Sequence, residues 1–585
     1  MSYQAPLEEM NYLVKQVFNV ENTLSAIDSF SEFDIELYTT VLEEAAKFSE
    51  NVLLPINHEG DEIGCQFENG QVTTPPGFKE AYAEFCQSGW QGTSGDPEYG
   101  GQGLPKTIHL LIEEMIFSTN TSFCLYPSLT NGAYHAIRAH ASDTIKQLYL
   151  PPMLEGRWAG TMALTEPHAG SDLGNIKTKA TEQTDGSYLV SGTKIFITGG
   201  EHDLSENIIH LVLAKLPDAP PGPKGISLFL VPKIKINEHG ELTETNQVSC
   251  GSIEHKMGIK ASATCVMNFD EAQGYLIGEK HKGLACMFTM MNLERLSIGV
   301  QGIGLAETAY QLSRNYAIER KQGKSQSAKL ASIIEHADIR RMLLEQRVHT
   351  EAARALMVFM GTQIDLQYHH QDAAIRENAA SLMSLLTPIA KAFFTDKGYE
   401  ACNLGLQVLG GHGYIREWGL EQLVRDAKIA QIYEGTNGIQ SQDLLVRKVG
   451  LDKMQLMQLL YDEIDAELAI KTSLPAAYQL QQQLSSALQC HRQTSQWIVQ
   501  NIEQRFFEIQ GGAVDYLHAS GYLVYGWLWL KMLNQLNDEL GETFCARKQL
   551  AGQYFCEHLL PNINQLCQKV GTGYQPYMDA EQSLI

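Results

Sequence analysis

The chain has 585 residues, which at about 150 residues per domain corresponds to about four domains, more than one hydrophobic core can span. Hydrophobic residues make up 44% of the chain and charged residues 19%, values that exclude a disordered, collagen-like or disulfide-scaffold protein. The formal net charge of −24 repels phosphate backbones and anionic lipid headgroups, so nucleic acid is not an expected partner.

The N-terminal part of the chain is predicted to be helical. Residues 1–13 contain Glu8 and Glu9 but no basic segment before an apolar stretch, which is not the pattern of a signal or transit peptide. Apolar residues recur at helical spacing in 34–54 and again in 108–117. We therefore expect an N-terminal helical domain over residues 1–157.

The pattern changes after Trp158. Residues 188–198, 208–216 and 226–231 are short runs rich in Ile, Val, Leu, Phe and Thr, separated by Gly and Pro turns. The Pro- and Gly-rich segment 217–225 is predicted as a surface loop, because strand-like residues resume directly after it. Residues 158–282 are therefore predicted as a middle β-domain with a barrel-like sheet.

Helical periodicity returns at Gly283 and continues almost to the end of the chain. Gly450 is predicted to stop a helix, and a stretch with regularly spaced leucines follows it. The apolar run 522–533 is about 12 residues long, shorter than the ~20 that a membrane-spanning helix needs, and is predicted as a buried helix. The expected fold is α+β multidomain, with a helical bundle at 283–450 and an additional C-terminal helical domain at 451–585.

Eleven cysteines are scattered between Cys65 and Cys567 without a Cys-x-x-Cys pair. This pattern fits neither a secreted disulfide framework nor a thiolate zinc site, so a reducing cytoplasm and no metal are expected.

One carboxylate has a distinctive setting. Glu434 lies between Ile432-Tyr433 and a Gly-Thr turn in the segment 431–440. Its apolar neighbours favour the protonated form, and if the fold removes the side chain from water its pKa would rise toward neutrality, where it could act as a general base on a weakly acidic C–H. A single glutamate is more often a surface residue, so the rest of the sequence has to support this interpretation.

That support comes from several motifs in a fixed order. The segments 163–172 (Ala-Leu-Thr-Glu-Pro-His-Ala-Gly-Ser-Asp) and 194–198 (Lys-Ile-Phe-Ile-Thr), together with the Glu434 segment, resemble the acyl-CoA dehydrogenase family. Further segments with family-like sequences and near-family spacing are 256–262, 316–320, 407–413 and 425–426. The resemblance extends over about residues 34–440, and the joint occurrence of these motifs makes coincidence a poor explanation.

The resemblance implies FAD as the cofactor. The residues implied to contact it are Leu164, Thr165, Ser171, Phe196, Thr198, Arg320, Gln407, Gly410, Gly411 and Thr436. Phe196 would cover one face of the flavin ring, and the Thr198 hydroxyl would reach the flavin N5. Arg320 would pair with FAD phosphate across a subunit contact, and the 407–411 loop would meet the adenine half from a neighbouring subunit.

Three positions depart from the common family pattern. Phe196 stands where many relatives have Trp, so a flat apolar face is kept but an indole N–H is not. Arg320 is followed by Lys-Gln-Gly instead of a segment with Phe-Gly, and Gly438 replaces a common Gln. At the last two positions the chain resembles long bacterial members of the family that act on 3-methylmercaptopropionyl-CoA.

The resemblance also implies a reaction. Glu434 would take the α-proton of an acyl-CoA thioester as the β-hydrogen leaves as hydride to the flavin, giving a trans-2-enoyl-CoA. The electrons would pass to an electron-transferring flavoprotein. Asn292 and Arg295 would lie near the CoA and thioester end of the substrate, although Arg295 could equally be a helix arginine paired with a neighbour. Long members with an added domain often form dimers, so a homodimer is expected.

Several alternatives stay open at this stage. The substrate is either 3-methylmercaptopropionyl-CoA or a medium- or long-chain fatty acyl-CoA. An acyl-CoA oxidase or related flavin oxidase would return the electrons to oxygen. A DNA-binding role of the C-terminal domain is remote, because residues 451–585 contain eight Lys and Arg against fourteen Asp and Glu.

Overall fold

The computed structural model describes residues 3–32, 34–326, 329–573, 578, 580, 581 and 583. It contains two compact units. Unit 1 consists of Met1–Ala46, Pro105–Ser118 and Ile298–Ile585, and unit 2 of Lys47–Leu104 and Thr119–Ser297. Each unit is therefore assembled from segments that are far apart in the sequence, and the long helix α9 (Gly283–Glu319) contributes residues to both.

Unit 2 combines helices with β-strands. Its helices are α4 (Leu54–Ile63), α5 (Phe78–Gln87), α7 (Thr121–His140) and α8 (Asp143–Leu154). Its strands are β1 (Gln66–Glu68), β2 (Gln71–Thr73), β3 (Trp158–Ala163), β4 (Lys179–Glu182), β5 (Tyr188–Thr198), β6 (Asn207–Lys215), β7 (Ile226–Pro232), β8 (Ile234–Ile236), β9 (Leu242–Thr245), β10 (Val248–Ile253) and β11 (Thr264–Ile277).

The main sheet of unit 2 closes on itself. β5 pairs with β4 and β11, β7 pairs with β11 and β6, and β6 meets β4 at Lys215 and Lys179. These pairings form a ring, with β10 and β3 attached to it, so the predicted barrel-like β-domain is confirmed. β5 has the predicted bounds, β6 is shifted by one residue at both ends, and β7 is one residue longer at its C-terminal end. β7 is buried along its whole length and β6 along nearly all of it, which explains their continuous apolar runs.

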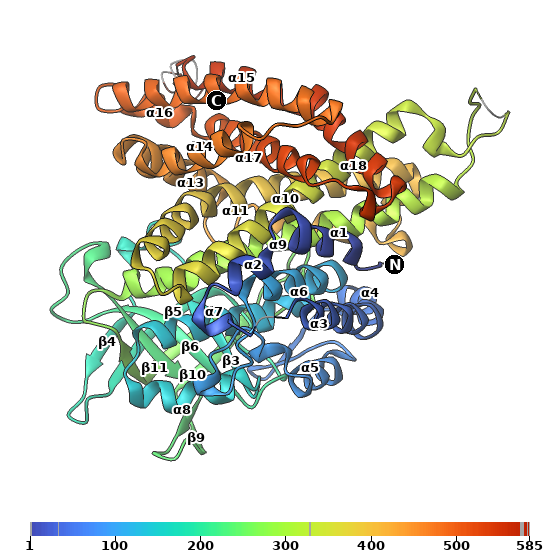
Figure 1. The fold of residues 1–585 in the computed structure, drawn as a ribbon. Helices are drawn as coiled ribbons and strands as arrows, with labels where there is room; N and C mark the ends of the chain where they lie inside the picture. The colour runs from blue at the N-terminus through green and yellow to red at the C-terminus, as the bar shows by residue number, and fades with distance from the viewer. Residues whose placement is uncertain are drawn as a thin grey trace. The chain divides into compact units, whose positions relative to one another are not determined.

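Two apolar cores hold unit 2 together. One lies inside the barrel and includes Val190, Phe229 and Phe269. The other joins the barrel to α7 and α8, which Figure 1 shows beside β3, and includes Trp158 and Tyr149, whose rings meet edge to face with centroids 5.6 Å apart. The β-domain is thereby packed on N-terminal helices, as the burial of large aromatic side chains requires.

Unit 1 is helical. Its remaining helices are α1 (Leu7–Tyr12), α2 (Val20–Leu24), α3 (Ile35–Phe48), α6 (Lys106–Thr119), α10 (Ala337–His369), α11 (Ala373–Leu409), α12 (Leu420–Ala430), α13 (Asn437–Gln442), α14 (Gln455–Leu468), α15 (Pro475–Asn501), α16 (Phe506–Gly511), α17 (Ala513–Asn534), α18 (Glu542–Tyr554) and α19 (Asn562–Val570); α3 and α6 each end in unit 2. The predicted helical N-terminal region, helical bundle and additional C-terminal helices are confirmed.

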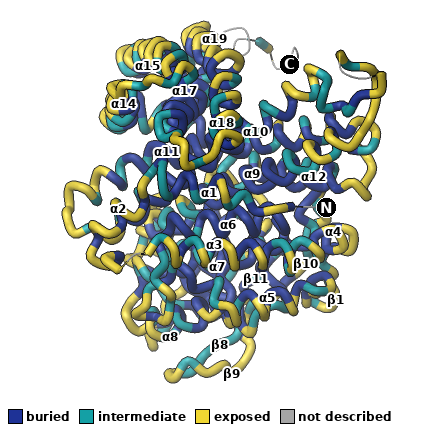
Figure 2. The backbone as a smooth tube through the Cα atoms, turned by 45° about the vertical axis from the view of Figure 1, so that its right-hand side comes forward, coloured by how far each residue is buried: buried dark blue, intermediate teal, exposed yellow. Residues whose placement is uncertain are grey.

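Helix α17 is the centre of the additional C-terminal helices. Figure 2 shows it as a buried segment near α14, α15, α18 and α19, whose exposed positions are frequent. Nearly all of its side chains between Tyr516 and Leu533 are buried. A helix that is apolar on all sides has to be enclosed by other elements, so the prediction of a buried helix at 522–533 is confirmed.

The prediction that Gly450 stops a helix is wrong, because the helical segment continues past it to Leu451. The helical segment Asp443–Leu451 runs through Gly450, and the left-handed residues are Lys453 (φ 55°) and Met454 (φ 67°). A Cβ on Gly450 would stand 2.1 Å from the Cδ1 atom of Ile502. Ile502 packs directly against the backbone at Gly450, so a larger residue here would require the Ile502 side chain to move.

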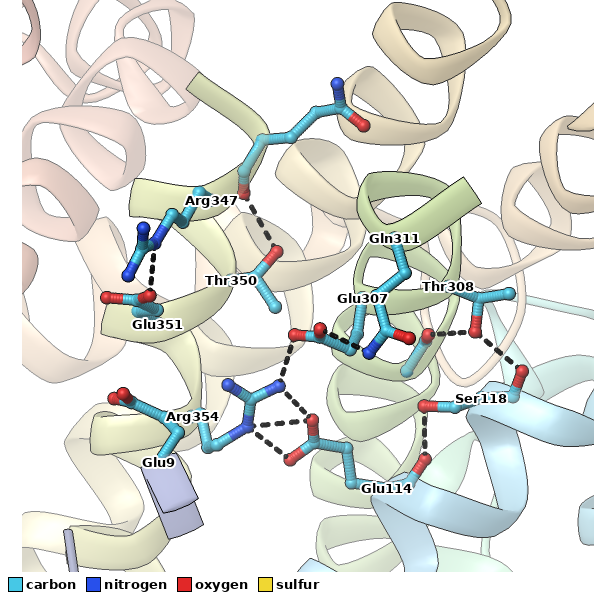
Figure 3. A network of polar contacts seen from close by, with 12 residues as sticks. Glu9, Glu114, Ser118, Glu307, Thr308, Gln311, Arg347, Thr350, Glu351 and Arg354 are labelled. Atoms are coloured by element: carbon cyan, nitrogen blue, oxygen red, sulfur yellow. Dashed lines mark hydrogen bonds and ion pairs between the residues drawn. The ribbon is translucent and has the colours of Figure 1, made fainter. Parts of the chain in front are cut away.

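Two groups of buried ion pairs, both with residues on α10, connect five helices of unit 1, and Figure 3 shows the group around Arg354. The Arg354 guanidinium of α10 donates to Glu114 of α6 at 2.6 to 3.0 Å and to Glu307 of α9 at 2.7 Å. The Lys548 ammonium of α18 donates to Glu351 of α10 at 2.8 Å and to Glu9 of α1. These pairs satisfy charges that would otherwise be too costly to bury.

Within the described residues, none of the helices combines the length and apolarity that crossing a bilayer requires.

Candidate active site

In unit 2, a buried ion pair joins the first two predicted cofactor motifs. The Lys194 ammonium, at the start of the 194–198 segment, donates to Glu166 Oε1 and to the carbonyl oxygen of Leu164, both at 2.9 Å. The backbone N–H of Ile195 donates to the carbonyl oxygen of Thr165 at 2.9 Å. The structure therefore places the predicted residues Leu164 and Thr165 beside the strand that carries Phe196 and Thr198.

Glu166 is the anchor of this loop. Besides Lys194, its carboxylate accepts hydrogen bonds from the backbone N–H of Lys177 at 2.7 Å and from the N–H and hydroxyl of Thr178 at 3.0 and 2.6 Å. Burial by itself raises the pKa of Glu166, but the Lys194 charge and these donors outweigh burial and lower the pKa to about 2. Glu166 is ionised at neutral pH and holds the 163–172 loop in place.

Phe196 is an exposed aromatic residue in a strained backbone conformation. β5 has one extra residue here, because Cys265 pairs with Ile197 while Met267 pairs with Lys194. Phe196 adopts φ 60° and its side chain is 59% exposed. A bulge can redirect a side chain, and a left-handed non-glycine residue costs roughly 1–2 kcal/mol. The bulge leaves a flat apolar ring exposed on this strand.

The predicted flavin residues of unit 2 fit such a ligand. Thr165 and Thr198 are half-buried, Ser171 is exposed, and Leu164 is buried. An exposed aromatic face beside hydroxyl donors suits the isoalloxazine ring and polar side chain of a flavin, whose ring needs apolar cover and whose oxygens need hydrogen bonds.

The predicted substrate residues of unit 2 lie on α9. The Arg295 guanidinium donates to Asn292 Oδ1 at 3.2 Å and lies over the ring of Phe288, 5.9 Å from its centroid. Asn292 is exposed and Arg295 is half-buried. The two residues are therefore brought together on one face of the helix, one turn apart.

In unit 1, Glu434 lies in a tight loop between α12 and α13. Glu434 is half-buried and adopts φ 55°, and Gly435 follows with φ 82°. The Thr436 hydroxyl caps α13 by accepting from the backbone N–H of Ile439 at 3.3 Å. The Gln440 side-chain amide donates to the carbonyl oxygens of Glu434 and Gly435, both at 3.4 Å. The two predicted residues, Glu434 and Thr436, thus belong to one capped turn.

The other predicted cofactor residues of unit 1 lie on its surface. Arg320, Gln407, Gly410 and Gly411 are all exposed. A Cβ added to either glycine would meet no atom within 4 Å. Gly410 ends α11 with φ 58° and ψ −132°, a conformation that favours glycine. These four residues are accessible to a ligand or to a second chain.

Sequence reasoning missed several residues that support the candidate site. Glu166 and Lys194 were part of the recognised motifs, but their ion pair had no sequence signal. Asn437 directly follows Thr436, and its side chain bonds to Asp396, which also accepts from His518. Asp396 and His518 are far from Glu434 in the sequence, and spacing alone gives no indication that they are near its loop.

Comparison with known proteins places the whole chain in one family. Models of the acyl-CoA dehydrogenase N-terminal, middle and C-terminal domains match residues 36–157, 161–272 and 281–448, and a domain described as acetyl-CoA dehydrogenase C-terminal like matches 460–581. The chain is 42% identical to the 3-methylmercaptopropionyl-CoA dehydrogenase of Ruegeria pomeroyi, with 90% of each chain covered.

Two further comparisons also extend over nearly the full length. The chain is 34% identical to a butyryl-CoA dehydrogenase of Syntrophomonas wolfei, with 96% of each chain covered. The crystal structure of a Bacillus anthracis acyl-CoA dehydrogenase complexed with FAD has the same fold at 22% identity, with a TM-score of 0.75 over 97% of this chain and 92% of that one. These findings confirm the predicted enzyme class and cofactor: the chain belongs to the acyl-CoA dehydrogenase family of FAD-dependent oxidoreductases, in the long form with an added C-terminal domain.

Proposed function

We propose that the protein converts an acyl-CoA thioester to its trans-2-enoyl-CoA, with Glu434 as the catalytic base. The backbone of Glu434 carries this proposal. A glutamate with φ 55° followed by a glycine with φ 82° is a strained turn, and strained non-glycine residues persist where the surrounding structure holds them for a function. Phe196 of the proposed flavin site is one of eight other described non-glycine residues with positive φ, a group that also includes Lys453 and Met454.

The proposed chemistry begins with proton transfer to the Glu434 carboxylate. An α-proton of a thioester is too weak an acid for a free carboxylate, so the carbonyl oxygen must receive hydrogen bonds as negative charge develops. We assign one of these to the backbone N–H of Glu434. FAD, when bound, supplies the acceptor for the hydride that leaves the β-carbon. Asn292 and Arg295 are proposed to contact the CoA and thioester end of the substrate.

We propose that two sets of residues hold FAD. The flavin is bound by Leu164, Thr165, Ser171, Phe196 and Thr198. This role is supported by the hydrogen bonds that join the 163–172 and 194–198 segments and by the exposed ring of Phe196. The remaining contacts to FAD are assigned to Arg320, Gln407, Gly410, Gly411 and Thr436. A guanidinium such as that of Arg320 suits bidentate binding of phosphate.

The base assignment is tested with Glu434→Gln, which keeps the shape of the side chain but removes its basicity. The variant should retain bound FAD and lose at least ~10³-fold in the rate of flavin reduction by acyl-CoA, within the range expected for a positioned base. Anaerobic stopped-flow absorbance measures the rate. Glu417→Gln, an exposed glutamate elsewhere in unit 1, is the control and should react as wild type. Near-wild-type reduction by Glu434→Gln would reject the assignment.

The substrate is proposed to be either 3-methylmercaptopropionyl-CoA or a fatty acyl-CoA, and the electron acceptor an electron-transferring flavoprotein. The Ruegeria pomeroyi relative supports the first substrate, and the Syntrophomonas wolfei relative supports a plain acyl chain. Anaerobic bleaching of the flavin by acyl-CoAs of graded length, one with a methylthio group, separates these substrates. Measuring peroxide release against reduction of an electron-transferring flavoprotein tests the acceptor, and stoichiometric peroxide would indicate an oxidase.

We further propose a homodimer with four domains at 1–157, 158–282, 283–450 and 451–585. The exposed Gly410 and Gly411 are followed by Tyr414, Ile415 and Trp418, whose side chains are 81%, 47% and 41% exposed. An exposed apolar cluster of this kind suits a subunit contact. Sedimentation equilibrium would show a monomer if this proposal is wrong.

A cytoplasmic location is proposed as well. All eleven cysteines are free thiols, seven of them buried. Free thiols of this number persist in a reducing compartment.

A further inference from the structure

The side chain of Asn437 is the attachment point of the Glu434 loop. Its amide oxygen accepts from the buried Lys391 ammonium of α11 at 2.8 Å. Its amide nitrogen donates to Asp396 Oδ1 at 2.7 Å and to Thr395 Oγ1 at 3.0 Å, both on α11. Its backbone N–H donates to the carbonyl oxygen of Gln431 at 3.0 Å, which closes the loop around Glu434. One side chain therefore ties the strained turn to a long, buried helix.

Asp396 connects this attachment to both sides of the loop. Besides Asn437, Oδ1 of Asp396 accepts from the Gln431 amide at 2.7 Å, so the residues that begin and end the loop share one carboxylate oxygen. The second oxygen, Oδ2, accepts from Nε2 of His518 at 2.9 Å. Asp396 and His518 are only 18% and 20% exposed, so water competes weakly for these bonds.

His518 belongs to the additional C-terminal helices. It lies on α17, and its ring meets the Phe393 ring of α11 edge to face, with centroids 5.5 Å apart. Its bond to Asp396 is therefore a polar link from these added helices to the Glu434 loop. Trp529, also on α17, donates instead to the carbonyl oxygen of Val348 on α10 at 3.2 Å. The same helix thus makes one contact that reaches the loop and one that does not.

We propose that Asp396 and His518 are positioning residues, through which the additional C-terminal domain holds the Glu434 loop in its reactive conformation. The inference rests on the proposed function in that Glu434 is the base. A strained turn needs several independent attachments to keep one conformation, and Asp396 supplies one to each side of the turn. This gives the added domain a direct role in the reaction instead of a role in packing alone.

The test compares variants of His518 with a destabilised control on the same helix. His518→Leu removes the donor, whereas His518→Gln can still donate to Asp396. Trp529→Phe removes one hydrogen bond between α17 and α10 but leaves the loop attachments intact. Asp396→Asn, which weakens the carboxylate bonds at constant size, is the second variant if His518→Leu does not fold.

Two readouts are measured on the FAD-bound protein. The rate of flavin reduction by acyl-CoA should fall about 10- to 100-fold in His518→Leu and Asp396→Asn, the loss expected from a small displacement of a catalytic group. Deuterium uptake of the peptide 431–442 should be about tenfold faster in both variants, because the loop opens more often. His518→Gln should restore both values to within about threefold of wild type, and Trp529→Phe should leave both unchanged even if it lowers the melting temperature.

The outcomes separate the two proposals. If acyl-CoA bleaches the wild-type flavin but His518→Leu and Asp396→Asn match Trp529→Phe in both readouts, the positioning role is rejected. It is also rejected if His518→Gln loses as much as His518→Leu. If no acyl-CoA bleaches the wild-type flavin, the proposed function fails, while the exchange measurement still decides whether His518 and Asp396 hold the loop.

Discussion

At the scale of single residues, the ion pair of Glu166 and Lys194 decides the shape of the proposed flavin loop. Glu166 is 3% exposed and Lys194 is fully buried. Replacing one partner leaves the other charge buried without compensation, which costs more than the pair itself contributes. The same pair fixes the carbonyl oxygen of Leu164, since the Lys194 ammonium binds both. Its loss should therefore affect stability and FAD binding together.

The pH dependence of stability tests this pair. The fold lowers the pKa of Glu166 from 4.5 to about 2, so its stabilisation is complete above about pH 4.5 and is lost as the pH falls toward 2. Burial lowers the pKa of its partner Lys194 from 10.5 to about 8, so the cost of keeping Lys194 charged offsets part of this stabilisation at pH 7. Glu166→Gln should lower stability at pH 7 and differ progressively less from wild type as the pH falls below about 4.5.

Thermal unfolding followed by circular dichroism between pH 7 and pH 3 measures this difference. Glu182→Gln is the matched control, because Glu182 forms an exposed ion pair with Lys280 in the same unit. Exposed pairs contribute little, so this variant should follow the wild-type curve at every pH. A constant offset between Glu166→Gln and wild type over the whole pH range would contradict the assigned pKa.

At the scale of elements, the bulge in β5 sets the direction of Phe196. Ladder pairing continues on both sides of the extra residue, from Thr198 with Thr264 to Thr193 with Asn268. The strand thus stays paired in the barrel, while the Phe196 side chain departs from the regular alternation of side chains between the two faces of the sheet. An exposed ring contributes little to folding, which supports the proposal that Phe196 contacts the flavin.

Phe196→Ala should separate binding from folding. Its side chain is 59% exposed, so the melting temperature of the FAD-free protein should change little. FAD should bind about tenfold more weakly, because stacked aromatic contacts contribute about 0.5–1.5 kcal/mol beyond their buried area. Equilibrium titration of FAD fluorescence gives the dissociation constant. Leu242→Ala, at an exposed position of β9, is the control, and an equal effect in both variants would show that Phe196 does not contact the cofactor.

At the scale of the whole molecule, the buried network around Arg354 links helices from widely separated parts of the sequence. Glu9, Glu114 and Glu307 precede Arg354 by up to about 350 positions, and Lys548 follows it by almost 200. Arg354 is 1% exposed and its two carboxylate partners are 0% and 9% exposed. Buried ion pairs thereby link the N-terminal helix, the bundle and the added C-terminal helices within unit 1.

Arg354→Met should destabilise unit 1 strongly. Removing the guanidinium leaves Glu114 and Glu307 buried without their partner, which costs about 3–5 kcal/mol. Arg341→Met is the control on the same helix, because Arg341 is exposed and pairs with the exposed Asp338 and the half-buried Glu345. Its loss should cost less than about 1 kcal/mol. Urea unfolding midpoints measure both. Similar midpoints for the two variants would show that the buried network contributes no more than a surface pair.

Much of the fold followed from local patterns in the sequence. The strand runs that became β5, β6 and β7, the loop between β6 and β7, and the buried run in α17 were predicted close to their observed bounds, because each depends on the hydrophobicity and turn residues of its own segment. The family and the identity of the residues around Glu434 followed from motifs that are contiguous in the chain. Gly450 shows the limit of such reasoning: its helical segment continues to Leu451, and its contact with Ile502 cannot be read from local sequence.

The tertiary structure alone decided which distant side chains support the candidate site. The motif containing Glu166 and the strand containing Lys194 were recognised separately, but only the folded chain shows that their charges meet. Asp396 and His518 carry no motif, and they reach the Glu434 loop because α11 and α17 pack together. Local sequence determines periodicity and turns through short-range sterics and burial. The partners of a buried polar group depend on how helices far apart in the chain pack, and that arrangement exists only in the folded protein.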